Sequence, residues 1–272
     1  MIKSIYFKFL SILTLRWRLW KASRAFFKGS AYYLEVRKVA AEKKLIERIS
    51  PNLRVLHGPF KDLIYSEYGA ICSSFGPKIL GLYECELFPY WAIFKSRDYD
   101  TIIDIGAAEG FYCVGLAQIF PKPIINAYEI TAEGQERISS LAQKNDLSTR
   151  IQIHGRFDRD ELHLYQGKHS LILCDCEGLE RDIFREDTVG LLVASDLIIE
   201  CHDFMDPTIS DTLAKLFEST HSIDIVEPVE RQLSDFPHFE EKIPSQSQKL
   251  LMDEERKHPT CWLICQALSK IR

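Results

Sequence analysis

The sequence predicts an α/β fold built on a doubly wound, mostly parallel sheet, and three observations support this. Short apolar, β-branched runs alternate with amphipathic stretches, which is typical of successive βαβ units. Several of the apolar runs carry an acidic residue at or near their end, and the run 101–105 is followed by a glycine-containing turn. The chain of 272 residues is 46% hydrophobic and 27% charged, as expected for a globular protein with a large core.

Composition also narrows the function classes. The net charge of -5 gives no general reason to expect a nucleic-acid partner. The eight cysteines form no C-x-x-C pair, which argues against zinc-ribbon and thioredoxin-like sites. Most of these cysteines stand in apolar runs, so we expect free, buried thiols and a reducing, cytoplasmic environment.

The first thirty residues differ in character from the rest. Basic residues interleave there with aromatic and aliphatic ones, and no acid precedes Glu35. The uncharged run 9–15 is much shorter than the roughly 20 residues that span a bilayer. We expect residues 1–28 to touch an anionic membrane surface peripherally. The alternatives are a helix packed on the following domain and a frayed tail.

The segment before residue 99 contains three expected elements. A helix over 31–50 is amphipathic and is ended by Pro51. Residues 55–65 suggest a small hairpin, and residues 82–95 a helix that leads into the next strand. We therefore divide the chain into an N-terminal extension (1–50), a cap over one side of the ligand pocket (51–98) and the main α/β domain (99–272).

The stretch 101–117 predicts a buried strand, a glycine turn and a helix. Asp104 stands near the C-terminal end of the strand, and Gly106 and Gly110 bracket the turn. Such a turn can direct backbone N–H groups and a helix N-terminus at a carboxylate or phosphate. The dinucleotide fingerprint G-x-G-x-x-G would need a glycine where this chain has Ala108.

The next predicted strand, 124–129, ends in Glu129. This residue follows Gly110 by about the interval expected for a carboxylate that binds ribose hydroxyls. Its alternative role is a negative charge at the N-terminus of the helix that starts near Thr131.

The rest of the chain continues the alternation and contains one long polar loop. That loop, 228–246, holds three prolines and is a candidate lid or substrate wall, or else disordered. We expect helices over 132–144, 178–184, 208–218 and 247–256, and strands over 150–154, 170–175, 197–201, 222–227 and 260–267.

Acidic residues concentrate after two of these strands. Because ligands of open α/β sheets bind at the carboxyl ends of the strands, we expect the two groups to meet at one edge of a cleft. The first group comprises Asp175, Glu177, Gly178 and Glu180, and the second Glu200, His202 and Asp203.

Three interpretations of this cluster compete. In the first, Asp175 orients a ligand, and His202 or Glu177 removes the proton of a hydroxyl group. In the second, Asp175, Glu200 and His202 bind a divalent metal. In the third, the acids cap the helix 178–184. We expect the first, since no compact metal-ligand motif appears in the sequence.

Five motifs carry a resemblance to a known family. The D-x-G-x-x-x-G pattern resembles the first motif of class I, Rossmann-like methyltransferases that use S-adenosylmethionine. The whole series is similar to the FkbM-type O-methyltransferases and covers most of residues 55–205. The motifs are GPF (58–60), PKILGLYECEL (77–87), DIGAAEG (104–110), DCEGLE (175–180) and IIECHD (198–203).

The resemblance implies a seven-stranded sheet whose last strand is antiparallel, with S-adenosylmethionine as cofactor. Tyr83 and Glu84 would lie near the methionine end, with Glu84 on the ammonium group, or else hold their helix against the sheet. Asp158 would accept a hydrogen bond from the adenine amino group, or else cap a helix. The implied cofactor-binding residues are Asp104, Gly106, Ala107, Gly110, Glu129, Asp158, Tyr83 and Glu84.

The function implied by the resemblance is methyl transfer to a hydroxyl of a carbohydrate, glycolipid or natural product. His202, Asp175 and Glu177 are the candidate catalytic residues, and we expect no nucleic-acid partner. The alternatives are an NAD(P)-dependent oxidoreductase, which Ala108 disfavours, and a non-catalytic binding protein that keeps the fold.

Overall fold

The computed structural model describes residues 31–232, 245–254, 256, 258 and 260–268. The chain forms two units, which divide between Leu45 and Ile46. Helix α2 (Ala31–Ile49) confirms the helix expected over 31–50. The segment 1–28, for which membrane contact is predicted, and residues 233–244 of the long loop lie outside the described residues. The predicted segment boundaries at residues 50 and 98 stay predictions.

No helix within the described ranges is both long enough and apolar enough to cross a membrane.

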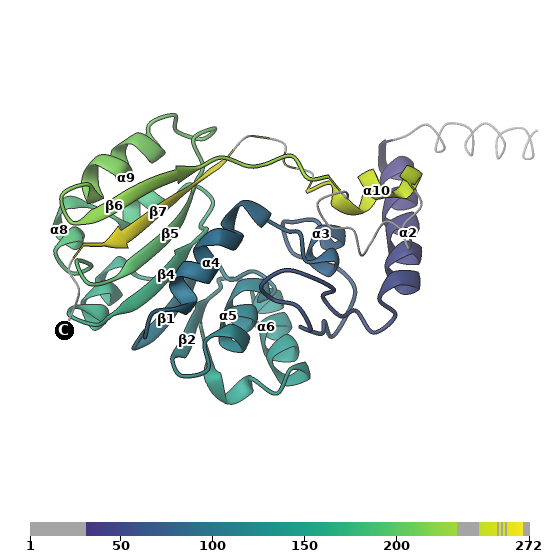
Figure 1. The fold of residues 1–272 in the computed structure, drawn as a ribbon, viewed down its shortest axis with the longest axis horizontal. Helices are drawn as coiled ribbons and strands as arrows, with labels where there is room; N and C mark the ends of the chain where they lie inside the picture. The colour runs from purple at the N-terminus through teal and green to yellow at the C-terminus, as the bar shows by residue number, and fades with distance from the viewer. Residues whose placement is uncertain (1–30, 233–244, 255, 257, 259, 269–272) are drawn as a thin grey trace, which may run out of the picture. The chain divides into compact units, whose positions relative to one another are not determined.

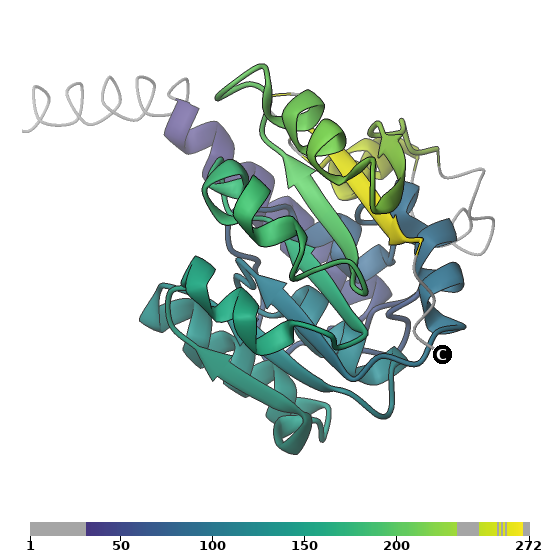
Figure 2. The ribbon, with the colours of Figure 1, turned by 90° about the vertical axis from the view of Figure 1, so that its left-hand side faces the viewer.

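Seven strands form one sheet in the order β3-β2-β1-β4-β5-β7-β6. All neighbours pair in parallel except β7, which is antiparallel to both β5 and β6. This confirms the predicted mostly parallel sheet with an antiparallel last strand, and Figures 1 and 2 show β7 (yellow) inserted between its two neighbours. The strands are β1 (Thr101–Ile105), β2 (Ile124–Tyr128), β3 (Ile151–His154), β4 (Ser170–Cys174), β5 (Asp196–Cys201), β6 (His221–Val226) and β7 (Cys261–Ala267).

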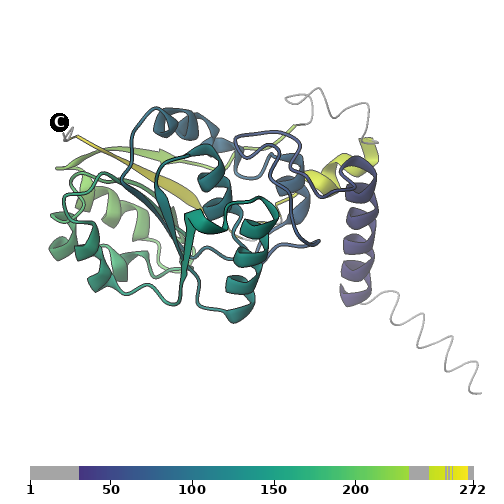
Figure 3. The ribbon, with the colours of Figure 1, turned by 90° about the horizontal axis from the view of Figure 1, so that it is seen from below.

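Helices cover both faces of this sheet, as a doubly wound fold requires (Figures 1 and 3). On one face lie α5 (Phe111–Ile119) and α6 (Ala132–Lys144). On the other lie the 3-10 helix η3 (Arg159–Tyr165), α7 (Glu180–Ile183), α8 (Glu186–Val189) and α9 (Ile209–Phe217).

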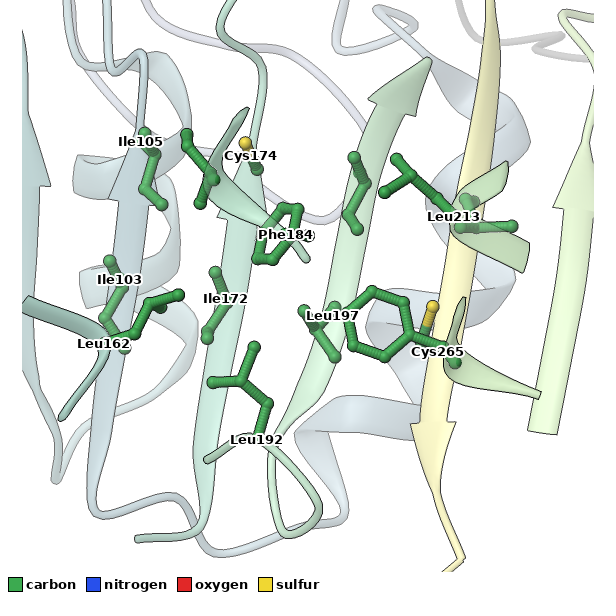
Figure 4. Close-up of a cluster of buried hydrophobic side chains, with 14 of the residues drawn as sticks. Ile103, Ile105, Leu162, Ile172, Cys174, Phe184, Leu192, Leu197, Leu213 and Cys265 are labelled. Carbon is green, nitrogen blue, oxygen red and sulfur yellow. The ribbon is translucent and has the colours of Figure 1, made fainter. Parts of the chain in front are cut away.

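The core on the second face follows the two-residue period of the strands. Ile103 and Ile105 of β1 and Ile172 of β4 point into it, and α9 contributes Leu213 (Figure 4). Ile102, which directly precedes Ile103, is also fully buried, but its side chain belongs to the opposite face of the sheet. Both faces of β1 are therefore covered, which explains its continuous apolar run.

The region before β1 differs from the prediction. The expected helix over 82–95 is divided into a 3-10 turn, η1 (Cys85–Leu87), and α4 (Phe88–Lys95). A further short helix, α3 (Phe75–Leu80), precedes them. Gly81 ends α3 in the left-handed conformation, and a proline in the first turn of α4 fits a new start there. The hairpin expected over 55–65 is reduced to one antiparallel bridge between Arg54 and Ile64.

The last helix, α10 (Ser245–Met252), packs on α3 and is shorter than the 247–256 expected. The residues that follow it are therefore not helical, and two of them, Glu254 and Arg256, line the cavity described below.

Candidate functional site

A cavity of about 1310 Å³ opens at the carboxyl ends of β1, β2, β4 and β5. The strand order reverses between β1 and β4, and such a switch point is where open α/β sheets bind their ligands. All the predicted site residues line this cavity except Gly110. Gly110 is instead the N-cap of α5, with φ 99°, and packs near Ile138 of α6.

The turn after β1 is held tightly against the neighbouring strands. Gly106 has φ 88°, and a Cβ there would stand 1.7 Å from the carbonyl oxygen of Asp175. The N–H groups of Gly106 and Ala107 both donate to the Tyr128 carbonyl. These N–H groups are therefore not free for an anion, in contrast to the sequence-based expectation. The glycine is needed so that β1 and β4 can end side by side.

Asp104 is a buried acid with one unsatisfied oxygen. Its side chain is 1% exposed, and Oδ2 has no hydrogen-bond partner among the described residues. Burial raises the pKa of Asp104 to about 7, although the backbone N–H of Cys113 opposes the shift. A cationic ligand beside Oδ2 would favour the ionised carboxylate.

Glu129 supports both roles that the sequence left open. Its Oε1 accepts hydrogen bonds from the Thr131 backbone N–H and hydroxyl, each at 2.7 Å, at the start of α6. Its Oε2 accepts from the Ala108 N–H at 3.1 Å. The carboxylate thus ties the glycine turn to α6 while it lines the cavity. Oε1 already accepts two hydrogen bonds, so only Oε2 retains a lone pair for a further donor.

Asp158 caps a helix, which is the alternative role predicted for it. It is the N-cap of η3, and its Oδ1 accepts a hydrogen bond from the Asp160 N–H at 3.0 Å. Glu161 completes a reciprocal capping box. The preceding Phe157 is buried edge-on against Tyr128, with ring centroids 4.7 Å apart, and supplies an apolar wall.

Glu84 is buried and already has partners. Its Oε1 lies 2.9 Å from Nη2 of Arg256, and its Oε2 accepts a hydrogen bond from the Tyr112 hydroxyl. Burial, reinforced by nearby carboxylates, raises the pKa of Glu84 to about 8. The neighbouring Tyr83 packs its ring on Phe111 at 5.6 Å. Neither residue stands on the helix expected over 82–95, because η1 and α4 begin after them.

Two basic residues of this cavity were not predicted. Lys78 is buried, with Nζ 2.5 Å from Glu109 Oε1 and 2.8 Å from Ser73 Oγ. Arg256 reaches Glu84 and, through Nη1, stands 3.5 Å from Glu200 Oε1. Lys78 lies inside an apolar stretch of the sequence, which was the available signal. For Arg256 no local signal pointed to the cavity, since Glu84 and Glu200 are more than fifty residues away.

The acids after β4 and β5 meet around one imidazole, as predicted, except Asp203, which instead accepts hydrogen bonds from the backbone N–H and hydroxyl of Ser210 on α9. His202 Nδ1 lies 2.8 Å from Oε1 of the fully buried Glu180. His202 Nε2 lies 3.6 Å from Asp175 Oδ1, 3.6 Å from Glu177 Oε2 and 3.9 Å from Glu200 Oε2. A buried carboxylate on Nδ1 fixes the orientation of the ring and directs Nε2 at the cavity.

This convergence of like charges shifts the proton affinities. Burial, followed by the charge of Glu200, holds the pKa of Asp175 well above its usual value. Burial by itself lowers the pKa of His202, but the hydrogen bond and charge of Glu180 outweigh it, so the net shift is upward. The capping interpretation receives little support, because α7 has only four residues and no side chain caps its N-terminus.

The comparisons with known proteins concern the fold. No family model matches the chain, and no curated protein sequence matches it significantly. The O-methyltransferase TomG from Streptomyces achromogenes, solved with S-adenosylmethionine, is 11% identical over 65% of this chain and 77% of its own, with a TM-score of 0.47. An rRNA methylase from Streptococcus thermophilus is 10% identical over 68% and 97%, with a TM-score of 0.46.

A precorrin-6y C5,15-methyltransferase from Geobacter metallireducens GS-15 is 13% identical over 66% of this chain and 88% of its own, with a TM-score of 0.43. These three proteins act on different kinds of substrate according to their names. A likeness at this level does not extend to the substrate of this chain.

Proposed function

We propose that this protein transfers the methyl group of S-adenosylmethionine to a hydroxyl oxygen of a carbohydrate, glycolipid or natural product. The observation that carries the proposal is one cavity with two chemically different ends. Asp104 and Glu129 stand at the tips of the neighbouring strands β1 and β2, and the His202 cluster stands across the same cavity at β4 and β5.

The β1–β2 end fits the cofactor. Asp104 offers a buried oxygen without a partner among the described residues, which suits a cationic ligand. Glu129 keeps a lone pair on Oε2 for a ribose hydroxyl, and Phe157 with Asp158 provides an apolar wall and an acceptor for the adenine. The cavity exceeds the roughly 300–1,000 Å³ of a typical ligand pocket, so an acceptor also has room.

S-adenosylmethionine supplies a methyl group that is already electrophilic on its sulfonium sulfur. The chain's own work is to align the acceptor oxygen with that methyl group and to remove the hydroxyl proton. His202 Nε2 and the Glu177 carboxylate both face the acceptor space and are the groups that take this proton, while Asp175 orients the hydroxyl. Glu180 acts on the reaction only through the ring of His202.

The sugar-like acceptor is supported by the cavity lining as well as by the resemblance. Carboxylates at the β4–β5 end can accept hydrogen bonds from neighbouring hydroxyls. Beside them, Phe204 is 45% exposed and stacks on His258 with ring centroids 4.6 Å apart. An exposed aromatic face next to acceptors suits a ring that carries both C–H and O–H groups.

Isothermal titration with S-adenosylmethionine tests the proposal. We expect binding by the wild-type chain that Asp104→Ala and Glu129→Ala each weaken at least about tenfold, since each removes a buried acceptor for a charged or hydroxyl donor. Glu133→Ala is the matched control, because this acid is exposed on α6 and should leave the affinity unchanged. No heat with either S-adenosylmethionine or S-adenosylhomocysteine would overturn the proposed function.

A further inference from the structure

We infer that Asp175, Glu200 and His202 bind one divalent metal ion at the acceptor end of the cavity. One ligand atom from each residue lies within 4.8 Å of the other two. The three come from the ends of β4 and β5, which pair in parallel and hold their tips at the same height. Ligands at about 2.1 Å from an ion stand roughly 3–4 Å apart, so a contraction of about 1 Å completes the site.

The imidazole is already oriented as a metal ligand. His202 is 3% exposed, and its Nδ1 is held at 2.8 Å by Glu180, whose carboxylate is completely buried. Its Nε2 forms no hydrogen bond with any described residue. Histidine ligands of metals commonly bond a carboxylate through the second ring nitrogen, which fixes the tautomer and exposes the lone pair. Glu180 has the position of that outer partner.

The carboxylates are oriented in the same way, with one oxygen held and the other presented. Glu200 Oε1 accepts a hydrogen bond from the Thr260 hydroxyl at 2.7 Å and faces Arg256. Its Oε2 is the oxygen that points at His202. Asp175 Oδ1 is a buried atom with no hydrogen-bond partner among the described residues, and it also faces Nε2 of His202. Three ligand atoms, one from each residue, therefore converge on one point.

The balance of charge around this point calls for a cation. Arg256 and Arg231 are shared among Glu84, Glu86 and Glu254 on the neighbouring side of the cavity. Arg256 touches the cluster only at Glu200, at 3.5 Å. Asp175 and Glu177 have no guanidinium or ammonium within 4 Å among the described residues. Like charges at such spacing repel, and either a retained proton or a cation between them relieves the repulsion.

Two carboxylate oxygens and one imidazole suit borderline divalent ions such as Mn²⁺, with water or an acceptor oxygen in the positions that face the cavity. The existence of the metal site does not depend on the proposed function, but its role in methyl transfer does. An ion there lowers the pKa of a bound hydroxyl. Because the ion then occupies Nε2 of His202, the proton passes to Glu177 instead, whose side chain is 66% exposed and can release it to solvent.

A titration of the full-length, chelator-treated chain with Mn²⁺, followed by electron paramagnetic resonance of the free ion, tests the site. Mn²⁺ is the probe because the eight cysteines would attract softer metals such as zinc. We expect one bound Mn²⁺ per wild-type chain. Asp175→Asn and Glu200→Gln should each weaken binding at least about tenfold, and Glu180→Gln about 10–100-fold through the outer partner.

Glu186→Gln is the matched control, since this acid is exposed on α8. A wild-type chain that retains no Mn²⁺ overturns the inference, as does retention that Asp175→Asn and Glu200→Gln leave as strong as Glu186→Gln does. Both test substitutions keep side-chain volume, and circular dichroism identifies any variant that fails to fold; the wild-type titration decides in that case. A chain that binds S-adenosylmethionine but no Mn²⁺ refutes the metal site alone, and the opposite result refutes the methyl donor alone.

Discussion

The two ends of the cavity use carboxylates in opposite ways. At the β1–β2 end the acids are part of a hydrogen-bonded frame. Glu129 bonds Ala108 and Thr131, and only one oxygen of Asp104 lacks a partner among the described residues. Such a frame needs little from a ligand in order to be stable, and it offers a single point of attachment for a cation.

At the β4–β5 end the acids face one another around His202. Asp175, Glu177 and Glu200 approach the same ring nitrogen, and the guanidinium that touches this group is shared with other acids. This end is stabilised when a cation arrives, whereas the frame at the other end is complete without one. The contrast shows that the acids of the β1–β2 end are held by hydrogen bonds, whereas those of the β4–β5 end leave a concentration of negative charge that a bound cation would offset.

Among the tests of this comparison, we expect the largest effect from Arg256→Met. We expect a loss of about 3–5 kcal/mol in the free energy of unfolding, because the substitution removes the guanidinium beside Glu84 and leaves Arg231 as the counter-charge of Glu254 and Glu86. Urea denaturation measures it. Arg181→Met is the control: its ion pair with Asp206 is solvent-exposed and should be worth about 0–1 kcal/mol. Equal losses would show that Arg256 does not offset the charge of the buried acids.

The next test uses two glycines of one motif. Gly106→Ala would place a Cβ 1.7 Å from the Asp175 carbonyl oxygen, whereas in Gly110→Ala the nearest atom is at 3.2 Å. Both residues have positive φ, so both alanines are strained. We expect Gly106→Ala to cost about 3 kcal/mol or more and Gly110→Ala about 1–2 kcal/mol, measured by thermal or urea unfolding. Gly106→Ala should also weaken Mn²⁺ binding, since Asp175 must move. Indistinguishable variants would contradict the role of Gly106 in joining the two ends.

The cofactor end could be predicted because its pieces are contiguous. Asp104, Gly106 and Glu129 belong to a single βαβ unit, in which strand ends and a glycine turn are visible as a local pattern. The seven strands were predictable for the same reason, since each is an apolar run. The meeting of Asp175 with His202 followed from the rule that parallel strands deliver their carboxyl ends to one edge.

Other features could not be read from the sequence because they depend on distant contacts. Arg256 bonds Glu84, which lies 172 positions earlier in the chain, and the residues around Arg256 show no periodic pattern that would indicate this contact. The late start of the helix expected over 82–95 also escaped prediction, since Glu84 adopts the left-handed conformation, with φ 49°, and the helical turns begin only after it. The insertion of β7 between β5 and β6 is likewise determined by tertiary packing and not by local propensity.

The pH dependence of stability distinguishes the buried acid of the frame. The pKa of Asp104 is about 7 in the folded chain against an ordinary value of 3.8, so between these pH values the native chain holds a proton that the unfolded chain has lost. The free energy of unfolding therefore falls as pH rises from about 4 to 7. Compared with wild type, Asp104→Asn should be relatively more stable at pH 8 than at pH 5, by about 2–4 kcal/mol. Urea denaturation at both pH values checks this, and a constant difference between the two chains would contradict it.

The smallest expected effect is the release of a fraction of a proton when the cofactor binds. At pH 7 Asp104 is roughly half protonated, and a cationic cofactor beside its unpartnered oxygen should drive it to the carboxylate. Binding of S-adenosylmethionine should then release on the order of half a proton per chain. Isothermal titration in two buffers with different ionisation enthalpies measures the release. Asp104→Asn should abolish it, while Glu200→Gln, at the other end of the cavity, should leave it intact. A release lost in Glu200→Gln but kept in Asp104→Asn would mean that the cation of the ligand faces β4 and β5, and the assignment of the two ends would have to be exchanged.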